Sequence, residues 1–137
     1  MRLCANTGAR LHLVRPLGFS LDARQLRRAR LDYAALTNVQ VHADLASCLA
    51  WLGEARVFAF ESGGSRIYAQ AQFAPGDVLL FGSETRGLPS AVLDSLPRER
   101  QLTIPMLAGN RSLNLANAVS VAVYEAWRQQ DFRTAAR

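Results

Sequence analysis

Three short polar segments of this 137-residue chain contain residue types whose spacing suits ligand binding, and each follows an apolar run. They are residues 61–64 (ESGG), residues 82–89 (GSETRGLP) and residues 110–114 (NRSLN), the last of these after Ile104. Glycine lets a backbone approach a ligand closely, and serine, glutamate, arginine and asparagine side chains can orient one. Glycine turns before a proline-started helix are common, so the second segment taken alone also fits an ordinary turn.

Other familiar ligand motifs are absent from the sequence. It contains no G-x-G-x-x-G, no G-x-x-x-x-G-K-[ST] and no G-x-S-x-G, which disfavours a standard Rossmann site, a P-loop and a hydrolase nucleophile elbow. Neither of the two histidines has the nearby aspartate and serine of a catalytic triad. We expect His12 to pack within a strand and His42 to lie on the surface.

The two cysteines, Cys4 and Cys48, form no C-x-x-C and no Cys/His cluster in the sequence. We therefore expect free thiols in a reducing cytosol rather than a disulfide scaffold or a zinc module, and no metal. No apolar run approaches the ~18 residues that span a bilayer. Polar residues interrupt the apolar stretch near the N-terminus, which disfavours a signal peptide. These features predict a cytoplasmic protein.

The positive charge is arginine alone and lies mostly at one end of the chain. There are 16 Lys+Arg against 11 Asp+Glu, a formal net charge of +5, and none of the 16 is lysine. Residues 1–33 hold seven arginines and two acids, whereas residues 34–137 hold nine of each. Arginine-rich surfaces attract phosphate chains. The charge pattern alone is equally compatible with a nucleic-acid surface and with a solvated helix face.

The elements that must position the polar segments follow from the apolar periodicity. We expect strands at residues 10–14, 39–41, 56–60, 77–81 and 101–104, and helices at 21–31, 44–52, 89–96 and 114–130. Their alternation indicates a single α/β domain over residues 1–137, with a mostly parallel sheet and helices on both faces. The apolar run 77–81 is typical of a strand covered on both faces. In such sheets, ligands bind beyond the carboxyl ends of strands, where the three polar segments lie.

Taken together, the motifs FGSETRGLP, IPM and RSLNLANAVSVAVYEAWRQ resemble the SPOUT class of RNA ribose 2′-O-methyltransferases. The opening RLCANTGARLHLVRPLGFSLDARQLRRARLDY is similar to the tRNA (cytidine/uridine-34) 2′-O-methyltransferase family, which modifies the wobble ribose of leucine tRNAs. The resemblance extends from Arg2 to about Gln129. It implies a C-terminal trefoil knot, S-adenosylmethionine (AdoMet) as cofactor, tRNA as substrate and a homodimer. Because the sulfonium is a good leaving group, the reaction needs no metal.

The resemblance also implies roles for individual residues. Arg2 matches the arginine at the reacting hydroxyl; because its pKa is above ~12, we expect it to clamp phosphate or orient the hydroxyl rather than accept the proton. Ser112 and Asn114 match the polar pair of the third motif. The implied cofactor contacts are Phe60, Gly82, Glu84, Gly87, Ile104 and Ser112, and the implied tRNA contacts are Arg24, Arg27, Arg28 and Tyr124.

Plainer roles remain open for several of these residues. Ser112 or Asn114 can cap the last helix, Glu84 can pin its own loop, and Tyr124 can pack in the core or a dimer. Trp51 and Trp127 are expected to serve in packing. Family members also carry a strand before the arginine matched by Arg2, so we expect this chain to lack it. That departure leaves an alternative function, a catalytically impaired RNA-binding module that keeps the cofactor fold.

Overall fold

The structure, a computed structural model, describes residues 1–22 and 38–133. The chain divides into two compact units, one containing Met1–Glu54 and the other formed by Ala55–Arg133. Each unit has its own sheet rather than a share of the single sheet expected from the sequence, and the strands pair in parallel, as predicted. The two units are described in turn.

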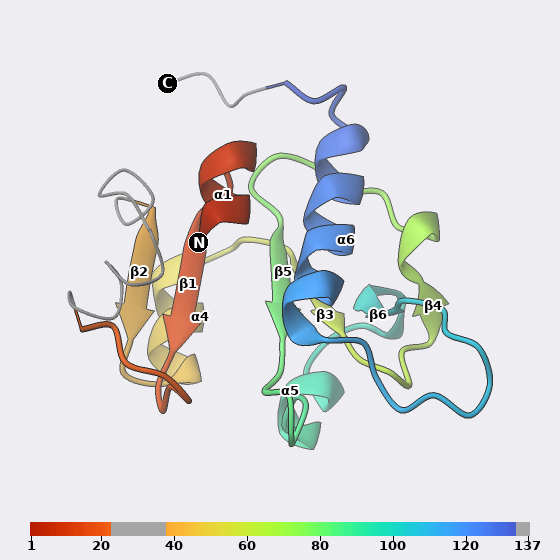
Figure 1. Cartoon of the computed structure of the whole chain (residues 1–137), viewed down its shortest axis with the longest axis horizontal. Coiled ribbons are helices and arrows are strands. Elements are labelled where there is room, and N and C mark those ends of the chain that lie inside the picture. Colours follow the sequence, from red (N-terminus) through yellow and green to blue (C-terminus); the bar gives the residue numbers. More distant parts are fainter. Residues whose placement is uncertain (23–37, 134–137) are drawn as a thin grey trace. The chain divides into compact units, whose positions relative to one another are not determined.

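In the first unit, two strands pair in parallel and a helix contacts both of them. The elements are β1 (Leu11–Val14), β2 (Val39–His42) and α4 (Leu45–Leu52), and the two strands lie side by side in Figure 1. Helix α4 begins after Asp44, whose Oδ1 accepts a 2.7 Å hydrogen bond from the Ser47 N–H. Such a cap satisfies one of the free N–H groups of the first turn, so the start of this helix follows directly from its sequence. The predictions for residues 39–41 and 44–52 are confirmed.

Helix α1 (Arg2–Thr7) was not predicted. It ends at Gly8, whose φ of 75° is a left-handed conformation that glycine adopts without strain. Further along the unit, the Ser20 hydroxyl oxygen accepts a 3.1 Å hydrogen bond from the Asp22 N–H, as expected of a capping serine. Residues 21 and 22, where a helix over 21–31 was expected to begin, have no regular secondary structure, and residues 23–31 lie outside the described residues.

The histidines differ from expectation in one respect. His12 lies within β1, as predicted, and is half-buried. The prediction that His42 lies on the surface is wrong, because its side chain is only 6% exposed. His42 ends β2 opposite Val14, and the helix that follows covers it. The Trp51 ring packs 4.9 Å from the His12 ring, although Trp51 itself is exposed.

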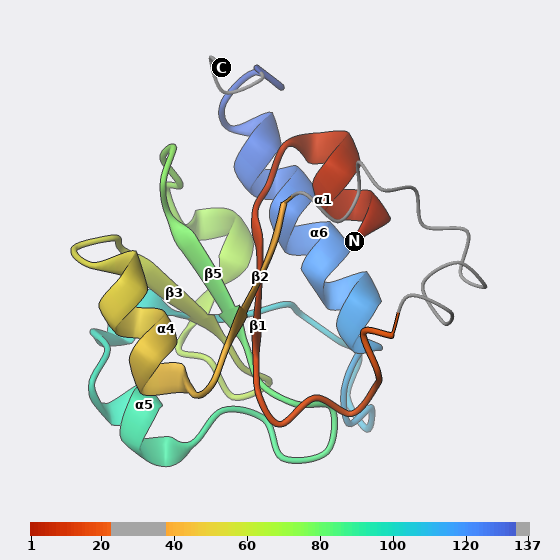
Figure 2. The same ribbon diagram turned by 90° about the vertical axis from the view of Figure 1, so that its left-hand side faces the viewer.

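In the second unit, four parallel strands form a sheet in the order β4-β6-β3-β5. The strands are β3 (Val57–Phe60), β4 (Arg66–Ile67), β5 (Val78–Phe81) and β6 (Gln101–Thr103). The helices are η1 (Tyr68–Gln70), α5 (Ser90–Asp94), η2 (Arg98–Arg100) and α6 (Leu115–Arg128). Helix α6 runs alongside β5 (Figure 2). The short strand β4 and the two 3-10 turns were not predicted.

The core of the second unit centres on β3, whose four residues are all buried. Phe58 packs edge-on against Phe73 at 5.0 Å, and Phe60 stacks on Phe81 at 4.7 Å between ring centroids. Residues 77–81 form the expected strand, β5, and the coverage of both its faces stays a prediction. Strand β5 ends the sheet and is half-buried throughout, whereas β3, with a neighbour on each side, is the fully covered strand.

Polar contacts fix the two ends of this sheet layer. Arg56 and Asp77 immediately precede the paired strands β3 and β5, and their side chains form a two-point ion pair at 2.8 and 2.7 Å. At the far end of α6, the Gln129 amide donates to the carbonyl oxygen of Ala71 at 2.9 Å and accepts from the Phe73 N–H at 2.8 Å. These contacts tie the segment before β5 to the helix.

Among the described residues, no helix is both long and apolar enough to cross a membrane.

Candidate functional site

The three polar segments leave the sheet of the second unit at the same edge. Strand β3 pairs with β5 so that Phe60 lies opposite Phe81, and with β6 so that Phe60 lies opposite Leu102. Because all three strands run parallel, the loops that follow them begin side by side. The arrangement expected from the sequence is therefore present within one compact unit.

The first loop, residues 61–64, is held to the end of β6. The Glu61 N–H donates to the carbonyl oxygen of Leu102 at 2.9 Å, and the Thr103 hydroxyl donates to the carbonyl oxygen of Ser62 at 3.2 Å. Gly64 lies so close to β6 that an added Cβ would stand 2.4 Å from the Leu102 backbone. At Gly63 an added Cβ would meet nothing within 4 Å, so this part of the loop faces open space.

The second loop, residues 82–89, folds back on itself. The Gly87 N–H donates to the carbonyl oxygen of Ser83 at 2.9 Å, and the Ser83 hydroxyl oxygen accepts from the Arg86 N–H at 3.2 Å. A Cβ on Gly82 would lie 2.0 Å from the carbonyl carbon of Gly87, and Gly87 has a φ of 63°. Both glycines predicted to contact the cofactor are thus required for the shape of this loop.

Glu61 joins the first two loops, a role that the sequence analysis did not assign. One of its carboxylate oxygens accepts from the Ser62 N–H at 3.1 Å, and the other accepts from the Leu88 N–H at 3.4 Å. Glu84, the acid singled out by the motif, lies exposed in the bend that Ser83 and Gly87 close. The only sequence signal for Glu61 was its place directly after a buried strand.

The third loop connects β6 to α6 and contains the predicted polar pair. Ile104 is half-buried and packs against the core, whereas Ser112 and Asn114 are exposed. The Asn114 side chain accepts a 3.2 Å hydrogen bond from the Asn117 N–H and caps α6. The plainer role considered for Asn114 is therefore present. The capping side chain lies where the third loop meets α6, two residues after Ser112.

The remaining predicted site residues lie elsewhere. Arg2 is exposed on α1 of the first unit. Tyr124 is 46% exposed on α6, and its ring contacts the half-buried Trp127 edge-on at 5.8 Å. Arg24, Arg27 and Arg28 lie outside the described residues.

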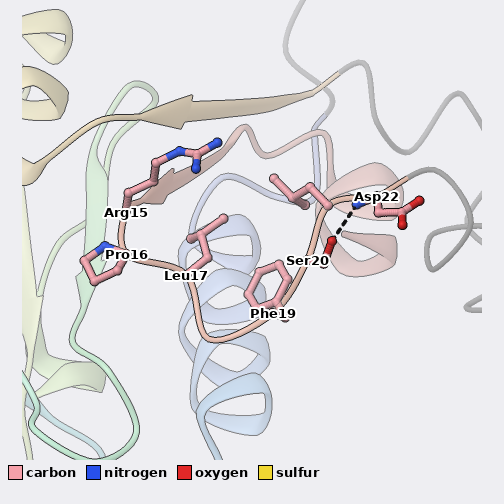
Figure 3. A pocket seen from close by; sticks show the side chains of 7 residues that line it. Arg15, Pro16, Leu17, Phe19, Ser20 and Asp22 are labelled. Carbon is pink, nitrogen blue, oxygen red and sulfur yellow. Dashed lines mark hydrogen bonds between the residues drawn. The ribbon is translucent and has the colours of Figure 1, made fainter.

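A separate hollow of about 680 Å³ lies along one segment of the first unit (Figure 3). Its lining residues are Arg15, Pro16, Leu17, Phe19, Ser20, Leu21 and Asp22. Among the residues that the structure describes, one continuous stretch, 15–22, contributes the lining, and no second described element completes the hollow. The glycine-bearing loops of the second unit are the better candidate for a ligand site, because three elements converge there.

A parallel α/β fold with glycine-bearing loops at the carboxyl ends of its strands agrees with the SPOUT-type methyltransferase class, to which similar solved structures and a matching family model assign it. The chain belongs to the SpoU rRNA Methylase family, whose family model matches residues 1–124. It is 52% identical over 132 residues to the tRNA (cytidine(34)-2'-O)-methyltransferase of Methylovorus glucosotrophus, covering 96% of this chain and 86% of that protein.

Solved structures agree with this assignment. One, described as "Structural insights into the 2-OH methylation of C/U34 on tRNA", superposes with a TM-score of 0.86 at 49% identity, covering 96% of this chain and 86% of that one. Another, an AdoMet-bound rRNA methyltransferase from Sinorhizobium meliloti, has a TM-score of 0.71 at 27% identity and covers 93% of this chain and 49% of that one. The predicted fold class and family are thereby confirmed.

Proposed function

We propose that this chain transfers a methyl group from AdoMet to the ribose 2′-hydroxyl of nucleotide 34 of tRNA, a cytidine or uridine, in the cytoplasm. The observation that carries the proposal is the meeting of three loops at one sheet edge, in a chain 52% identical to a tRNA (cytidine(34)-2'-O)-methyltransferase. Leucine tRNAs are the proposed substrates, because the motifs resemble a family that modifies them.

The loops of the second unit fit AdoMet. Phe60 and Ile104 supply apolar side chains near the ends of their strands, and Gly63 leaves open space where a ligand can approach the backbone. Gly82 and Gly87 shape the neighbouring bend, where Glu84 and other polar side chains are exposed. A site with apolar walls, accessible backbone and a few polar groups suits a nucleoside-containing cofactor. We assign the cofactor contacts to these residues and to Ser112.

When bound, AdoMet supplies an electrophilic methyl group on a good leaving group. The protein then has to place the ribose hydroxyl in line and help its proton leave. Arg2 is the proposed positioning group for the hydroxyl or its neighbouring phosphate, since an arginine remains protonated and is a poor base. Ser112 and Asn114 are the proposed polar pair at the reacting hydroxyl. Water or a neighbouring group takes the proton.

The proposed tRNA contacts are Arg24, Arg27, Arg28 and Tyr124. Seven arginines among residues 1–33 provide a charge that suits a phosphate backbone. Val121 is also exposed on α6, and we propose that this helix packs against a second copy of the chain. We further propose that both units form one methyltransferase domain with the trefoil knot typical of the class. The family match supports a single domain because it spans both units.

The test combines cofactor binding with methyl transfer on the full chain. Calorimetry with S-adenosylhomocysteine should detect binding, and a leucine tRNA transcript should accept one methyl group from AdoMet. The absence of both would refute the proposal. Cofactor binding without transfer to any tRNA would favour the alternative, an RNA-binding module that keeps the cofactor fold.

Two variants separate the capping role of Asn114 from its proposed role in the reaction. Asn114→Ser keeps a capping oxygen, whereas Asn114→Ala removes it and should cost about 1 kcal/mol of stability. If Asn114 acts at the hydroxyl, the serine variant should retain stability but lose turnover at saturating substrate. A serine variant with wild-type turnover would show that capping is the only role of this side chain.

A third variant addresses Arg2. Arg2→Ala should abolish methyl transfer while the affinity for S-adenosylhomocysteine is largely retained. Equal loss of both would instead give Arg2 a structural role. Circular dichroism of the variant checks that the fold persists.

A further inference from the structure

Three potential metal ligands come together in the first unit, on three different elements. His12 lies on β1, His42 ends β2 and Cys48 lies on α4. One ligand atom from each lies within 4.8 Å of the other two. His42 and Cys48 are buried and His12 is half-buried. The sequence spacing gave no sign of this cluster, because 30 residues separate the histidines and only the fold brings them together.

The two imidazoles already point their ring nitrogens at each other. His12 Nδ1 and His42 Nε2 lie 2.9 Å apart, and the ring centroids are 5.2 Å apart. The difference between these two distances is about the sum of the two centroid-to-nitrogen distances. The rings therefore meet edge to edge through these nitrogens. A hydrogen bond in this position needs one protonated nitrogen and one lone pair. A cation between the rings would use a lone pair from each.

The distances are close to those of a tetrahedral zinc site. Zn–N bonds of about 2.0–2.1 Å and a Zn–S bond of about 2.3 Å place two nitrogens about 3.3 Å apart and a nitrogen and sulfur about 3.6 Å apart. The histidine pair would open by about 0.4 Å, and the widest separation in the cluster would close by at most about 1.2 Å. Side-chain rotation on β1, β2 and α4 can supply shifts of this size without changing the strand register.

The protonation states also suit a metal that binds imidazole and thiolate. Burial, then the nearby His42 and Arg10, lower the pKa of His12, so its ring is neutral at pH 7. Burial raises the pKa of the Cys48 thiol, so a metal must displace its proton. Zn²⁺ binding would release the Cys48 proton, and each of the two facing imidazole nitrogens would have to offer a lone pair. A water would be the fourth ligand of such a site.

We propose that His12, His42 and Cys48 bind one Zn²⁺ ion that joins β1, β2 and α4. Two imidazoles and a thiolate at distances close to those of a tetrahedral site favour zinc. This cluster of described residues contains no carboxylate, which disfavours magnesium and calcium. The ion would have a structural role, because it would link the three elements that form the sheet and helix of this unit. The site is independent of the methyl-transfer proposal, and either can fail without the other.

The binding test uses the untagged full chain, with Zn²⁺ alone as the probe and Co²⁺ as a spectroscopic substitute. Calorimetry should give one Zn²⁺ per chain, and Co²⁺ should produce a thiolate-to-metal charge-transfer band. Cys48→Ser should abolish the band and weaken Zn²⁺ binding at least about a hundredfold. Cys4→Ser is the matched control, since Cys4 is the other buried free cysteine and is not part of the cluster. The control should bind as the unmodified chain does.

A second variant and a second readout keep the proposal testable if Cys48→Ser folds poorly. His12→Gln changes a half-exposed ligand and should also lose Zn²⁺ binding. Zn²⁺ should raise the Tm of the unmodified chain and of Cys4→Ser, but not of His12→Gln. The proposal is overturned if the unmodified chain binds no Zn²⁺, or if the histidine variant binds it with unchanged affinity. Binding without any rise in Tm would refute the structural role.

Discussion

Replacing Gly82 by alanine should disrupt the bend that follows β5. The new Cβ would lie 2.0 Å from the carbonyl carbon of Gly87 and 2.3 Å from the backbone nitrogen of Leu88. Ordinary contact begins at 3.4 Å, so the facing backbone would have to move by about 1.4 Å. Overpacking of this kind costs about 1–3 kcal/mol. Loss of the hydrogen bond between Ser83 and Gly87 adds about 1 kcal/mol.

The expected total is about 2–4 kcal/mol, which corresponds to a fall in Tm of roughly 6–15 °C for a chain of this size. Urea denaturation measures the free energy of unfolding directly. Calorimetry with S-adenosylhomocysteine should show binding weakened by more than about tenfold, because each 1.4 kcal/mol of lost interaction is a factor of ten. The displaced bend contains Glu84 and Gly87, both proposed to contact the cofactor.

Gly63→Ala provides the matched control for this change. Gly63 lies in the adjacent loop, and its added Cβ would meet nothing within 4 Å. Its stability should therefore stay within about 0.5 kcal/mol of the unmodified chain. If Gly82→Ala is as stable as Gly63→Ala and binds S-adenosylhomocysteine as tightly as the unmodified chain does, the close packing inferred for this bend is refuted.

Further variants test two contacts in the second unit and the proposed tRNA contacts near the N-terminus. Glu61→Ala removes the carboxylate that joins the first two loops. Urea denaturation should show a free energy of unfolding lower by about 1 kcal/mol, and calorimetry should show weaker S-adenosylhomocysteine binding. Unchanged affinity would separate Glu61 from the site. Hydrogen bonds from Arg128, which outweigh the effect of burial, lower the pKa of Glu125 below its ordinary value of about 4.5. Glu125→Gln should therefore lower the free energy of unfolding by about 1 kcal/mol at pH 7. This difference should shrink as the pH falls below about 4.5, because the carboxylate contributes only while ionised. A pH-independent difference would contradict this reasoning. Replacing Arg27 and Arg28 together should weaken tRNA binding and flatten its salt dependence, and an unchanged salt slope would exclude this face.

Local sequence patterns predicted the elements and the position of the candidate site. Apolar runs marked the strands that became β3 and β5, and Asn114 marked the start of α6. The parallel pairing of these strands then brought the three loops to one edge. This part was predictable because it depends on periodicity, capping and strand direction, which are encoded within short stretches of chain.

Contacts between distant residues were not predictable in the same way. The burial of His42 depends on β1 and α4, and the contact between Glu61 and Leu88 crosses 27 residues. Likewise, the apolar composition of residues 77–81 could not show that β5 ends the sheet, because the strand order depends on which distant segments pair. Helix α1 was missed because its six residues carry too short a periodic pattern.

Position-resolved mass spectrometry of the product tRNA tests the central claim most directly. A leucine tRNA transcript is incubated with the full chain and AdoMet, digested and analysed fragment by fragment. The prediction is one added methyl group on nucleotide 34, and none when that nucleotide carries a 2′-deoxyribose. A methyl group on a different nucleotide, or one added equally well to the 2′-deoxy transcript, would contradict the proposed reaction.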